Sequence, residues 1–493
     1  MGNSILDQLE KDASVEAGLP FVELAARYFA RTRTAEGPVS TPLSPDEIAL
    51  RFAEPIPRDG RPLREIMERI EREILPDANK FFHPMYMGHQ VCAPLPAAVW
   101  MESVIGALNQ SIAIFEMSPT GTMVEHQVIR WMCDLVGYGA GSGGTLTSGG
   151  TEATFTALLA ARNAAMPDAW QDGVGADPPF VLYGEHAHYA VTRAIGQIGL
   201  GGKRGVPVRP KNFRMDVAEL RATMERLRTE GKEILAVVAT AGSTATGSFD
   251  DLETIAQLCD EHGVWLHVDA AHGASALLSA RPPRVLQFLK RARSLAWDPH
   301  KGMLLPLSAG MVLVRSERDL EGAFAQQAPY LFKETESERN VDQGIRSFQC
   351  SRRADVFKLW VALQRYGANG IGALYDHLCG TARSLYRMIG ERADFETIHE
   401  PESNILCFRY TGALTRQKAS ATHAHDAATE KKISDLNRAL RPAFNKNRSG
   451  WITSTVLEGK AVLRVTIMNP RTDEEHLRAL LDGLAEEAKR LAG

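Results

Sequence analysis

The order of apolar and polar positions predicts helices at the beginning of the chain. Residues 1 to about 80 combine polar turns with amphipathic stretches such as LREIMERIEREIL, and we expect this segment to be helical. Between residues 117 and 136, apolar side chains recur at the three- and four-residue spacing of a helix. The pattern therefore predicts an N-terminal helical segment and a further helix after it.

Short apolar runs then alternate with helical patterns. The runs are FVLYG (180–184), ILAVVATA (234–241), VWLHVDA (264–270), SLAWD (294–298) and AGMVLVR (309–315), and helical patterns cover 216–230 and 250–262. This alternation predicts an α/β fold whose mainly parallel sheet is covered by helices on both faces. Ligands of such sheets bind beyond the carboxyl ends of the strands.

The pattern changes after about residue 370. The segment 411–434, TGALTRQKASATHAHDAATEKKIS, is polar and has no period, so we expect an exposed loop. KAVLRVTIMNP predicts a strand, and TDEEHLRALLDGLAEEAKRL predicts a helix capped by Thr472. We therefore divide the chain into an N-terminal helical segment (1–90), a large domain (91–370) and a small C-terminal α+β domain (371–493).

Composition narrows the class of protein. The 493 residues are 44% hydrophobic and 24% charged, which is typical of a globular protein with a substantial core. The net charge of -4 gives no electrostatic reason to expect nucleic acid or a membrane surface as a partner. There is no evident signal peptide and no apolar run of the ~20 residues that span a bilayer. The six cysteines form no CxxC pair, so we expect reduced thiols and a cytoplasmic protein.

Unusual polar residues occur at four predicted strand ends. TSGGTEAT leads from a strand into a helix, and the free N–H groups at Gly150 and Thr151 favour an anion such as phosphate. YGEHAHYAV contains His188, and HVDAAH contains Asp269. The fourth stretch, SLAWDPHKGML, ends in Lys301. A lysine in that position is usually just solvated. A chemical role for Lys301 is therefore indicated only if the other three stretches point to the same chemistry.

A metal site is the first alternative for these residues. His267 and Asp269 lie on one face of a strand and would suit a pair of metal ligands. The carboxylate or thiolate cluster that would complete such a site is not evident, so we expect no metal. We interpret His186, His262 and His272 as core or surface histidines.

Pyridoxal 5'-phosphate accounts for all four stretches together. Its phosphate needs a helix start, and its ring can stack on an aromatic side chain such as His188. Its pyridine nitrogen needs a carboxylate such as Asp269, and its aldehyde needs a lysine such as Lys301 for a Schiff base. No other common cofactor needs this combination.

With these blocks the sequence resembles the group II pyridoxal-phosphate-dependent amino-acid decarboxylases, which include glutamate, cysteine sulfinate, aromatic amino-acid and diaminobutyrate decarboxylases. TSGGTEAT, AHYAV, HVDAA, SLAWDPHKGMLLPLSAGMVLVR and QCSRRADVFKLW occur in family order, and LRVTIMNP extends the resemblance into the C-terminal domain. The resemblance implies an aspartate-aminotransferase-like fold of type I and removal of the α-carboxylate of an L-amino acid. It also implies a homodimer with sites at the interface, in which the N-terminal segment wraps the partner.

The resemblance also implies roles for single residues. Lys301 matches the Schiff-base lysine, Asp269 the partner of the pyridine nitrogen and His188 the imidazole stacked on the ring. The further matches are Ala271 beneath the ring, Gly150, Thr151 and His300 at the phosphate, Thr244 beside the stacking histidine, Arg464 near the substrate carboxylate and His89 at the substrate.

Two features depart from the family pattern. Family members commonly carry a tyrosine in a loop that protonates Cα, but residues 331–349 contain none, and Tyr330 belongs to the preceding block. The block HPMYMGHQVCAPLP matches neither the glutamate nor the aromatic enzymes, whereas NQSIAIFEMSP is similar to the diaminobutyrate and glutamate branches. The alternatives to an α-decarboxylase are therefore a decarboxylating aldehyde synthase, another carbon–carbon lyase, a catalytically silent binding protein and, last, a metal hydrolase.

Overall fold

The computed structural model describes residues 5–41, 43–324, 341–412, 426–447 and 449–492. The chain packs into two compact units. The larger unit comprises Gln90–Arg383 and His399–Leu406, and the smaller unit comprises Met1–His89, Ser384–Ile398 and Cys407–Gly493. This partition groups the N-terminal segment with the C-terminal part, and the three-part division made from the sequence stays a prediction. In the described residues, no helix combines the length and the apolar character that a bilayer span requires.

The larger unit contains a seven-stranded sheet with the order β2-β10-β9-β8-β7-β3-β4. Its strands are β2 (Gly143–Thr147), β3 (Phe180–Gly184), β4 (Gly205–Val208), β7 (Ile234–Thr240), β8 (Trp265–Asp269), β9 (Ser294–Trp297) and β10 (Gly310–Val314). The pairs from β9 to β4 are parallel, whereas β10 is antiparallel to both β2 and β9. All five apolar runs form strands, so the prediction of an α/β fold with a mainly parallel sheet is confirmed.

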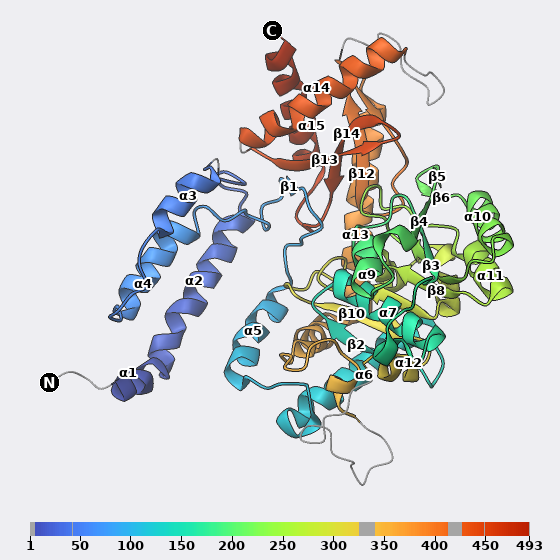
Figure 1. The fold of residues 1–493 in the computed structure, drawn as a ribbon. Helices are drawn as coiled ribbons and strands as arrows, with labels where there is room; N and C mark the ends of the chain where they lie inside the picture. The colour runs from blue at the N-terminus through green and yellow to red at the C-terminus, as the bar shows by residue number, and fades with distance from the viewer. Residues whose placement is uncertain (1–4, 42, 325–340, 413–425, 448, 493) are drawn as a thin grey trace. The chain divides into compact units, whose positions relative to one another are not determined.

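Helices cover both faces of this sheet (Figure 1). One layer contains α7 (Gly150–Ala165), α9 (Ala190–Gln197) and α12 (Arg318–Ala323), and the other contains α6 (Pro119–Val136), α11 (Leu252–His262) and the 3₁₀ segment η5 (Arg284–Arg291). The remaining elements are α5 (Pro96–Leu108), α8 (Ala169–Asp172), α10 (Val217–Thr229), α13 (Val356–Gly390), the hairpin β5 (Pro210–Lys211) with β6 (Arg214–Met215), and the turns η2 (Phe115–Met117), η3 (Gly202–Arg204), η4 (Gly273–Leu278) and η6 (Gln343–Ile345).

The two helical layers explain why the strands read as continuous apolar runs rather than alternating ones. Every residue of β8, β9 and β10 is buried. Side chains of both pleat faces must therefore be apolar or hydrogen-bonded. On the α7 face, Val181, Ala236 and Val238 of the sheet pack against Leu158 and Ile195 of the helices.

The strand directions bring the predicted site residues to one edge of the sheet. Because β10 is antiparallel to both of its neighbours, β2 runs in the same direction as β9, β8, β7 and β3. The carboxyl ends of these five strands therefore share an edge, and the chain leaves that edge through the segments that carry Gly150, His188, Thr244, Asp269 and Lys301. This is the edge at which open α/β sheets bind ligands.

The smaller unit contains a five-stranded sheet with the order β1-β13-β14-β12-β11. Its strands are β1 (Tyr86–Met87), β11 (Phe395–Thr397), β12 (Ile405–Tyr410), β13 (Trp451–Leu457) and β14 (Lys460–Thr466). Its helices are α1 (Ile5–Asp12), α2 (Val15–Arg33), α3 (Pro45–Phe52), α4 (Leu63–Arg69), the π-helical turn η1 (Ile70–Ile74), α14 (Ala427–Lys446) and α15 (Glu474–Ala492). The helical N-terminal segment that the sequence predicts is thus present.

Two local predictions in the C-terminal part were wrong. Helix α14 begins at Ala427, inside the predicted loop, because the side chain of Asp426 accepts a hydrogen bond from the N–H of Thr429 and caps the helix. Residues 413–425 of that loop lie outside the described residues. The cap of α15 is Asp473, whose carboxylate accepts N–H bonds at 3.0 and 3.1 Å, whereas the hydroxyl of Thr472 donates to the carbonyl of Pro84.

Candidate active site

A cavity of about 360 Å³ opens at the carboxyl edge of the seven-stranded sheet. Eight of the ten residues singled out in the sequence line it together: Gly150, Thr151, His188, Thr244, Asp269, Ala271, His300 and Lys301. They come from five separate segments of the chain, and the strand order alone brings them to one place. These eight residues of the larger unit therefore lie close enough together to form one candidate site.

The turn from β2 into α7 forms one wall of the cavity. A Cβ atom at Gly150 would lie 2.9 Å from the Cβ of Ala271 and 3.1 Å from a carboxylate oxygen of Asp298, so only glycine fits without a shift. The first N–H groups of α7 have no partner within the helix and face an anion favourably. The turn is thus a close-fitting cradle for a negatively charged group.

Lys301 follows β9 in a tight turn. Its backbone N–H donates to the carbonyl of Asp298 at 2.9 Å, and its Nζ lies 3.1 Å from Oδ2 of the same aspartate. Asp298 is buried, and the side chain of Lys301 is 19% exposed. The lysine is therefore held inside the cavity rather than extended into solvent.

The ring of His300 is fixed by the backbone that enters β10. The N–H of Ala309 donates to Nδ1 of His300 at 3.0 Å, and the N–H of His300 donates to the carbonyl of Ala309 at 3.1 Å. Burial lowers the pKa of His300, which favours the neutral ring. Because Nδ1 accepts, the proton of the neutral ring is on Nε2, which lies 3.5 Å from Asp298.

Asp269 ends β8 and is buried at the base of the cavity. Burial raises its pKa, while the charge of Lys301 and the N–H of Ala271, which donates to Oδ1 at 3.2 Å, act in the opposite direction. A cationic group placed beside this carboxyl would stabilise its ionised form. Asp269 is therefore suited to hold a protonated ring nitrogen.

His188 precedes α9 and is half-buried at the cavity. The N–H of Ala190 donates to its Nδ1 at 3.2 Å, so the proton of the neutral ring is on Nε2. Burial is the main cause of a lowered pKa, which favours this neutral form. Thr244 also lines the cavity, and in the described residues no hydrogen bond joins it to His188.

Three polar residues of the cavity had no role in the sequence-based site. Gln90, Thr240 and Asp298 line it, and each has a buried side-chain atom without a hydrogen-bond partner among the described residues: Nε2, Oγ1 and Oδ1. Asp298 was visible as a polar residue at a strand end. Thr240 lies inside an apolar run and carries no signal in the sequence pattern, whereas Gln90 follows His89 in the block where the family resemblance places substrate contacts.

The other residues considered in the sequence lie elsewhere or take structural roles. His89 and Arg464 belong to the smaller unit, where burial and then the charge of Arg464 lower the pKa of His89. His272 lines the cavity, and its Nε2 bonds to Oδ1 of Asn404 at 2.7 Å. His267 is buried and bonds through Nδ1 to Ser294. In the described residues, no three His, Cys, Asp or Glu side chains form a group suited to a metal ion.

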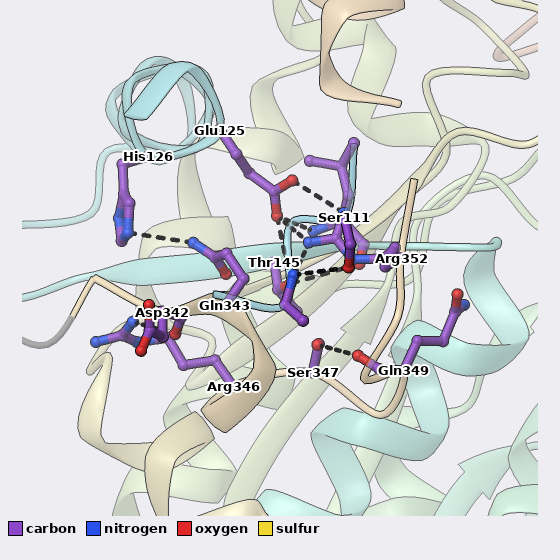
Figure 2. Close-up of polar contacts among 12 residues, drawn as sticks. Ser111, Glu125, His126, Thr145, Asp342, Gln343, Arg346, Ser347, Gln349 and Arg352 are labelled. Atoms are coloured by element: carbon purple, nitrogen blue, oxygen red, sulfur yellow. Dashed lines mark hydrogen bonds and ion pairs between the residues drawn. The ribbon is translucent and has the colours of Figure 1, made fainter. Parts of the chain in front are cut away.

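A network of polar contacts links α6 and the strand before the cradle to the segment that contains Arg352 (Figure 2). The carboxylate of Glu125 on α6 accepts from both terminal nitrogens of Arg352, at 2.9 and 2.6 Å, and from the N–H of Leu146 in β2 at 3.1 Å. Glu152, in the first turn of α7, accepts from Gln349 at 2.8 Å and from Ser148. Both ends of the cradle are thus anchored to the segment around residues 349–352.

The loop without tyrosine (331–349) falls partly outside the described residues, which resume at residue 341. The described part is attached to α6 and to the segment before it. The carbonyl of Val341 bonds to His126 at 2.9 Å, and the carboxylate of Asp342 accepts from the N–H of Phe115 at 2.7 Å. Figure 2 shows His126 also beside Gln343.

Comparisons with known proteins identify the family of the chain. Residues 45–411 match the model of the pyridoxal-dependent decarboxylase conserved domain. The chain is 32% identical to an L-2,4-diaminobutyrate decarboxylase of Rhizobium meliloti (strain 1021), over 89% of this chain and 84% of that protein. It is 27% identical to an aromatic-L-amino-acid decarboxylase of Bacillus atrophaeus, over 97% of both chains.

A solved structure agrees with the fold as well. The crystal structure of mouse CSAD matches with a TM-score of 0.89 and 26% identity, covering 97% of this chain and 99% of that one. The large sheet domain with a second, smaller sheet domain is thus the type I fold expected from the resemblance. The chain therefore belongs to the pyridoxal-dependent decarboxylase family, and it is an amino-acid decarboxylase whose cofactor is pyridoxal 5'-phosphate.

Proposed function

We propose that this enzyme removes the α-carboxylate of an L-amino acid to give the amine and CO2, with the cofactor held on Lys301. The observation that carries the proposal is the position of Nζ of Lys301, inside one cavity with Asp269, His188 and the glycine cradle. In the reaction the bond from Cα to the carboxylate carbon breaks, CO2 leaves and a proton takes its place at Cα. When bound, pyridoxal phosphate supplies an electron sink for the pair left on Cα.

The residues of the cavity fit this cofactor. Gly150 leaves room that a Cβ atom would fill, and α7 offers its free N–H groups to the phosphate. The Nε2 proton of His300 faces the same region, and Thr151 is in the first turn of α7. The unpartnered atoms Gln90 Nε2 and Thr240 Oγ1 call for polar groups inside the cavity. A phosphorylated pyridine bearing a hydroxyl group supplies such groups.

The side chains have distinct tasks in this proposal. Asp269 would keep the pyridine nitrogen of the bound cofactor protonated, since a cation beside it stabilises its ionised form. Ala271 and His188, which line the cavity together with Thr244, would hold the ring. The Nε2 proton of His188 is available at Cα, in a chain whose loop 331–349 has no tyrosine.

Arg464 and His89 are the substrate residues we propose. Arg464 is buried in β14, and among the described residues its Nε and Nη2 atoms have no hydrogen-bond partner. Its Nη1 donates only to the hydroxyl of Thr453, at 3.2 Å. Buried guanidinium nitrogens of this kind are suited to a carboxylate. We expect Arg464→Met to raise KM more than it lowers kcat, and an unchanged KM would remove Arg464 from the site.

Trapping tests the role of Lys301. Reduction of the loaded protein with borohydride, followed by peptide mass spectrometry, should place the cofactor on Lys301. The variant Lys301→Ala should form no adduct and lose turnover, whereas Lys290→Ala, which removes an exposed lysine on η5 that does not line the cavity, should retain both. An adduct on another lysine, or a Lys301→Ala variant that turns over at the parent rate, would refute the proposed mechanism.

Product analysis identifies the substrate and the outcome. The loaded protein is incubated in air with a panel of L-amino acids, and the products are identified by mass spectrometry. An amine from one amino acid supports the α-decarboxylase. An aldehyde with ammonia and hydrogen peroxide would instead assign the oxidative alternative, in which O2 takes the electron pair from Cα. We retain this alternative because residues 331–349 contain no tyrosine.

We further propose a homodimer in the cytoplasm. In the smaller unit, α1 and α2 expose Ile5, Leu6, Leu9 and Val15, each more than half exposed. Apolar helix surfaces of this kind mark association sites. None of the six cysteines, all of which the structure describes, forms a disulfide, as expected in a reducing compartment. Light scattering after size exclusion should give twice the chain mass of 54.1 kDa, and a triple change of Ile5, Leu6 and Leu9 to serine should lower it.

A further inference from the structure

We propose that Asp298 is a positioning residue that keeps the nitrogen of Lys301 protonated, both as the free amine and after its linkage to the cofactor. The second part rests on the proposed function of Lys301, whereas the first part does not. Oδ2 of Asp298 lies 3.1 Å from Nζ of Lys301 and 3.5 Å from Nε2 of His300. With 2% of its side chain exposed, this carboxylate is screened by almost no water.

The contacts of Asp298 distinguish this role from a structural one. A buried aspartate that serves the fold usually accepts hydrogen bonds from backbone N–H groups, as Asp250 does from Thr240 and Met215. In the described residues, the carboxylate of Asp298 accepts none, and its Oδ1 has no partner. The ion pair with Lys301 and the contact with His300 are therefore what this carboxylate provides.

The charges around Lys301 make Asp298 the decisive partner. Asp269 from β8 is the other carboxylate, and it makes no direct ion pair with Lys301. His188 and His300 favour their neutral forms because burial lowers the pKa of each. Lys358 on α13 also acts on His300, but its charge is matched by Glu102 and Asp355, at 3.0 and 3.1 Å.

Two glycines make room for the carboxylate of Asp298. Its backbone N–H donates to the carbonyl of Ala271 at 3.0 Å. A Cβ atom at Gly310 would lie 2.8 Å from Oδ1, and one at Gly150 would lie 3.1 Å from Oδ2. The carboxylate thus fits beside Lys301 because neither neighbouring position carries a side chain. An amide at this position would occupy the same space without the charge.

The test measures the protonation of Lys301 without any cofactor. The full-length protein is stripped of cofactor and pulsed with an acetylating reagent between pH 6 and 10, and acetylation of Lys301 is quantified by peptide mass spectrometry. Only the unprotonated amine reacts. We expect Asp298→Asn to lower the midpoint of this pH profile by about one unit. The acetylation rate of Lys301 at pH 7.5 should then rise about tenfold. Lys431, which keeps its own partner Asp435, is the internal reference.

A matched control separates this effect from general loss of charge. Asp319→Asn also converts an aspartate into an amide, but in the pair with Arg293, and it should leave the rate of Lys301 unchanged. If Asp298→Asn does not fold, as judged by circular dichroism, Asp298→Ser is measured against the same criterion. A rise of at least threefold in a folded variant supports the proposal, and a smaller change overturns it.

A spectroscopic measurement tests the linked form. After loading with pyridoxal phosphate, the absorbance of the protonated linkage is titrated with base. Its midpoint should fall by about one pH unit in Asp298→Asn. An unchanged midpoint would limit the role of Asp298 to the free amine and overturn the second part. If borohydride fails to trap the cofactor on Lys301 of the parent, the proposed function fails, while acetylation still decides whether Asp298 controls Lys301.

Discussion

The ion pair between Glu125 and Arg352 provides the sharpest test of how the cradle is supported. The two side chains are 0% and 6% exposed, and they form two charged hydrogen bonds of 2.9 and 2.6 Å. Arg352→Met leaves Glu125 with only the N–H of Leu146 and the hydroxyl of Thr145 as donors. At about 1.5–3 kcal/mol for each charged hydrogen bond, the loss is about 3–6 kcal/mol. This agrees with the ~3–5 kcal/mol cost of removing one partner from a buried pair.

Urea denaturation followed by circular dichroism measures this free energy. We expect Arg352→Met to lose about 4 kcal/mol, and the double variant Glu125→Leu/Arg352→Met to recover most of it, because the double variant leaves no buried charge unpaired. Arg209→Met, which breaks an exposed pair with Glu219, should cost less than about 1 kcal/mol. A double variant as unstable as the single one would refute the reasoning.

Two further predictions concern pH and steric fit. Burial lowers the pKa of His267 to about 3, so the stability that its neutral form contributes is complete above about pH 6.5 and is lost as the pH falls towards 3. From pH 7 to 5 the parent should lose about 2 kcal/mol more than His267→Leu, and equal losses in urea titrations would contradict this. A Cβ atom at Gly310 would lie 2.5 Å from Cα of Gly149, so Gly310→Ala should cost about 1–3 kcal/mol and weaken cofactor binding, measured by equilibrium titration. Gly322→Ala, where no atom lies within 4 Å, is the control and should bind the cofactor like the parent.

The sequence predicted the sheet well because its strands are fully buried. In an α/β chain, a continuous apolar run that ends at a turn, such as Phe180–Gly184, predicts a buried strand. The direction of β10 was beyond reach, since an apolar run looks the same in a parallel and an antiparallel strand. The start of α14 was also missed, because its first turns carry no large apolar residue before Ile433 and the cap at Asp426 is the main signal there.

The candidate site was predicted for the residues that have a chemical signature. Lys301, Asp269 and the glycine turn stand out because their types are unusual at strand ends, and the cavity contains all of them. Thr240 was missed because a threonine in a β-strand is ordinary and needs no explanation. Thr240 reaches the cavity because β7 lies beside β8, where Thr240 is paired with Asp269.

The antiparallel strand β10 also determines when the site can exist during folding. Gly310 pairs with Thr147, directly before the cradle, and Met311 pairs with Trp297, directly before the turn of Lys301. β10 is the last strand of this sheet along the chain, and its pairing with β2 joins residues that are far apart in sequence. Closing so long a stretch of chain is slow. A chain still emerging from the ribosome therefore cannot join the cradle after β2 to the turn of Lys301 after β9 until β10 has been synthesised. Uptake of the cofactor would consequently report on completion of the sheet, and pyridoxal phosphate would act as a ligand that selects fully assembled molecules.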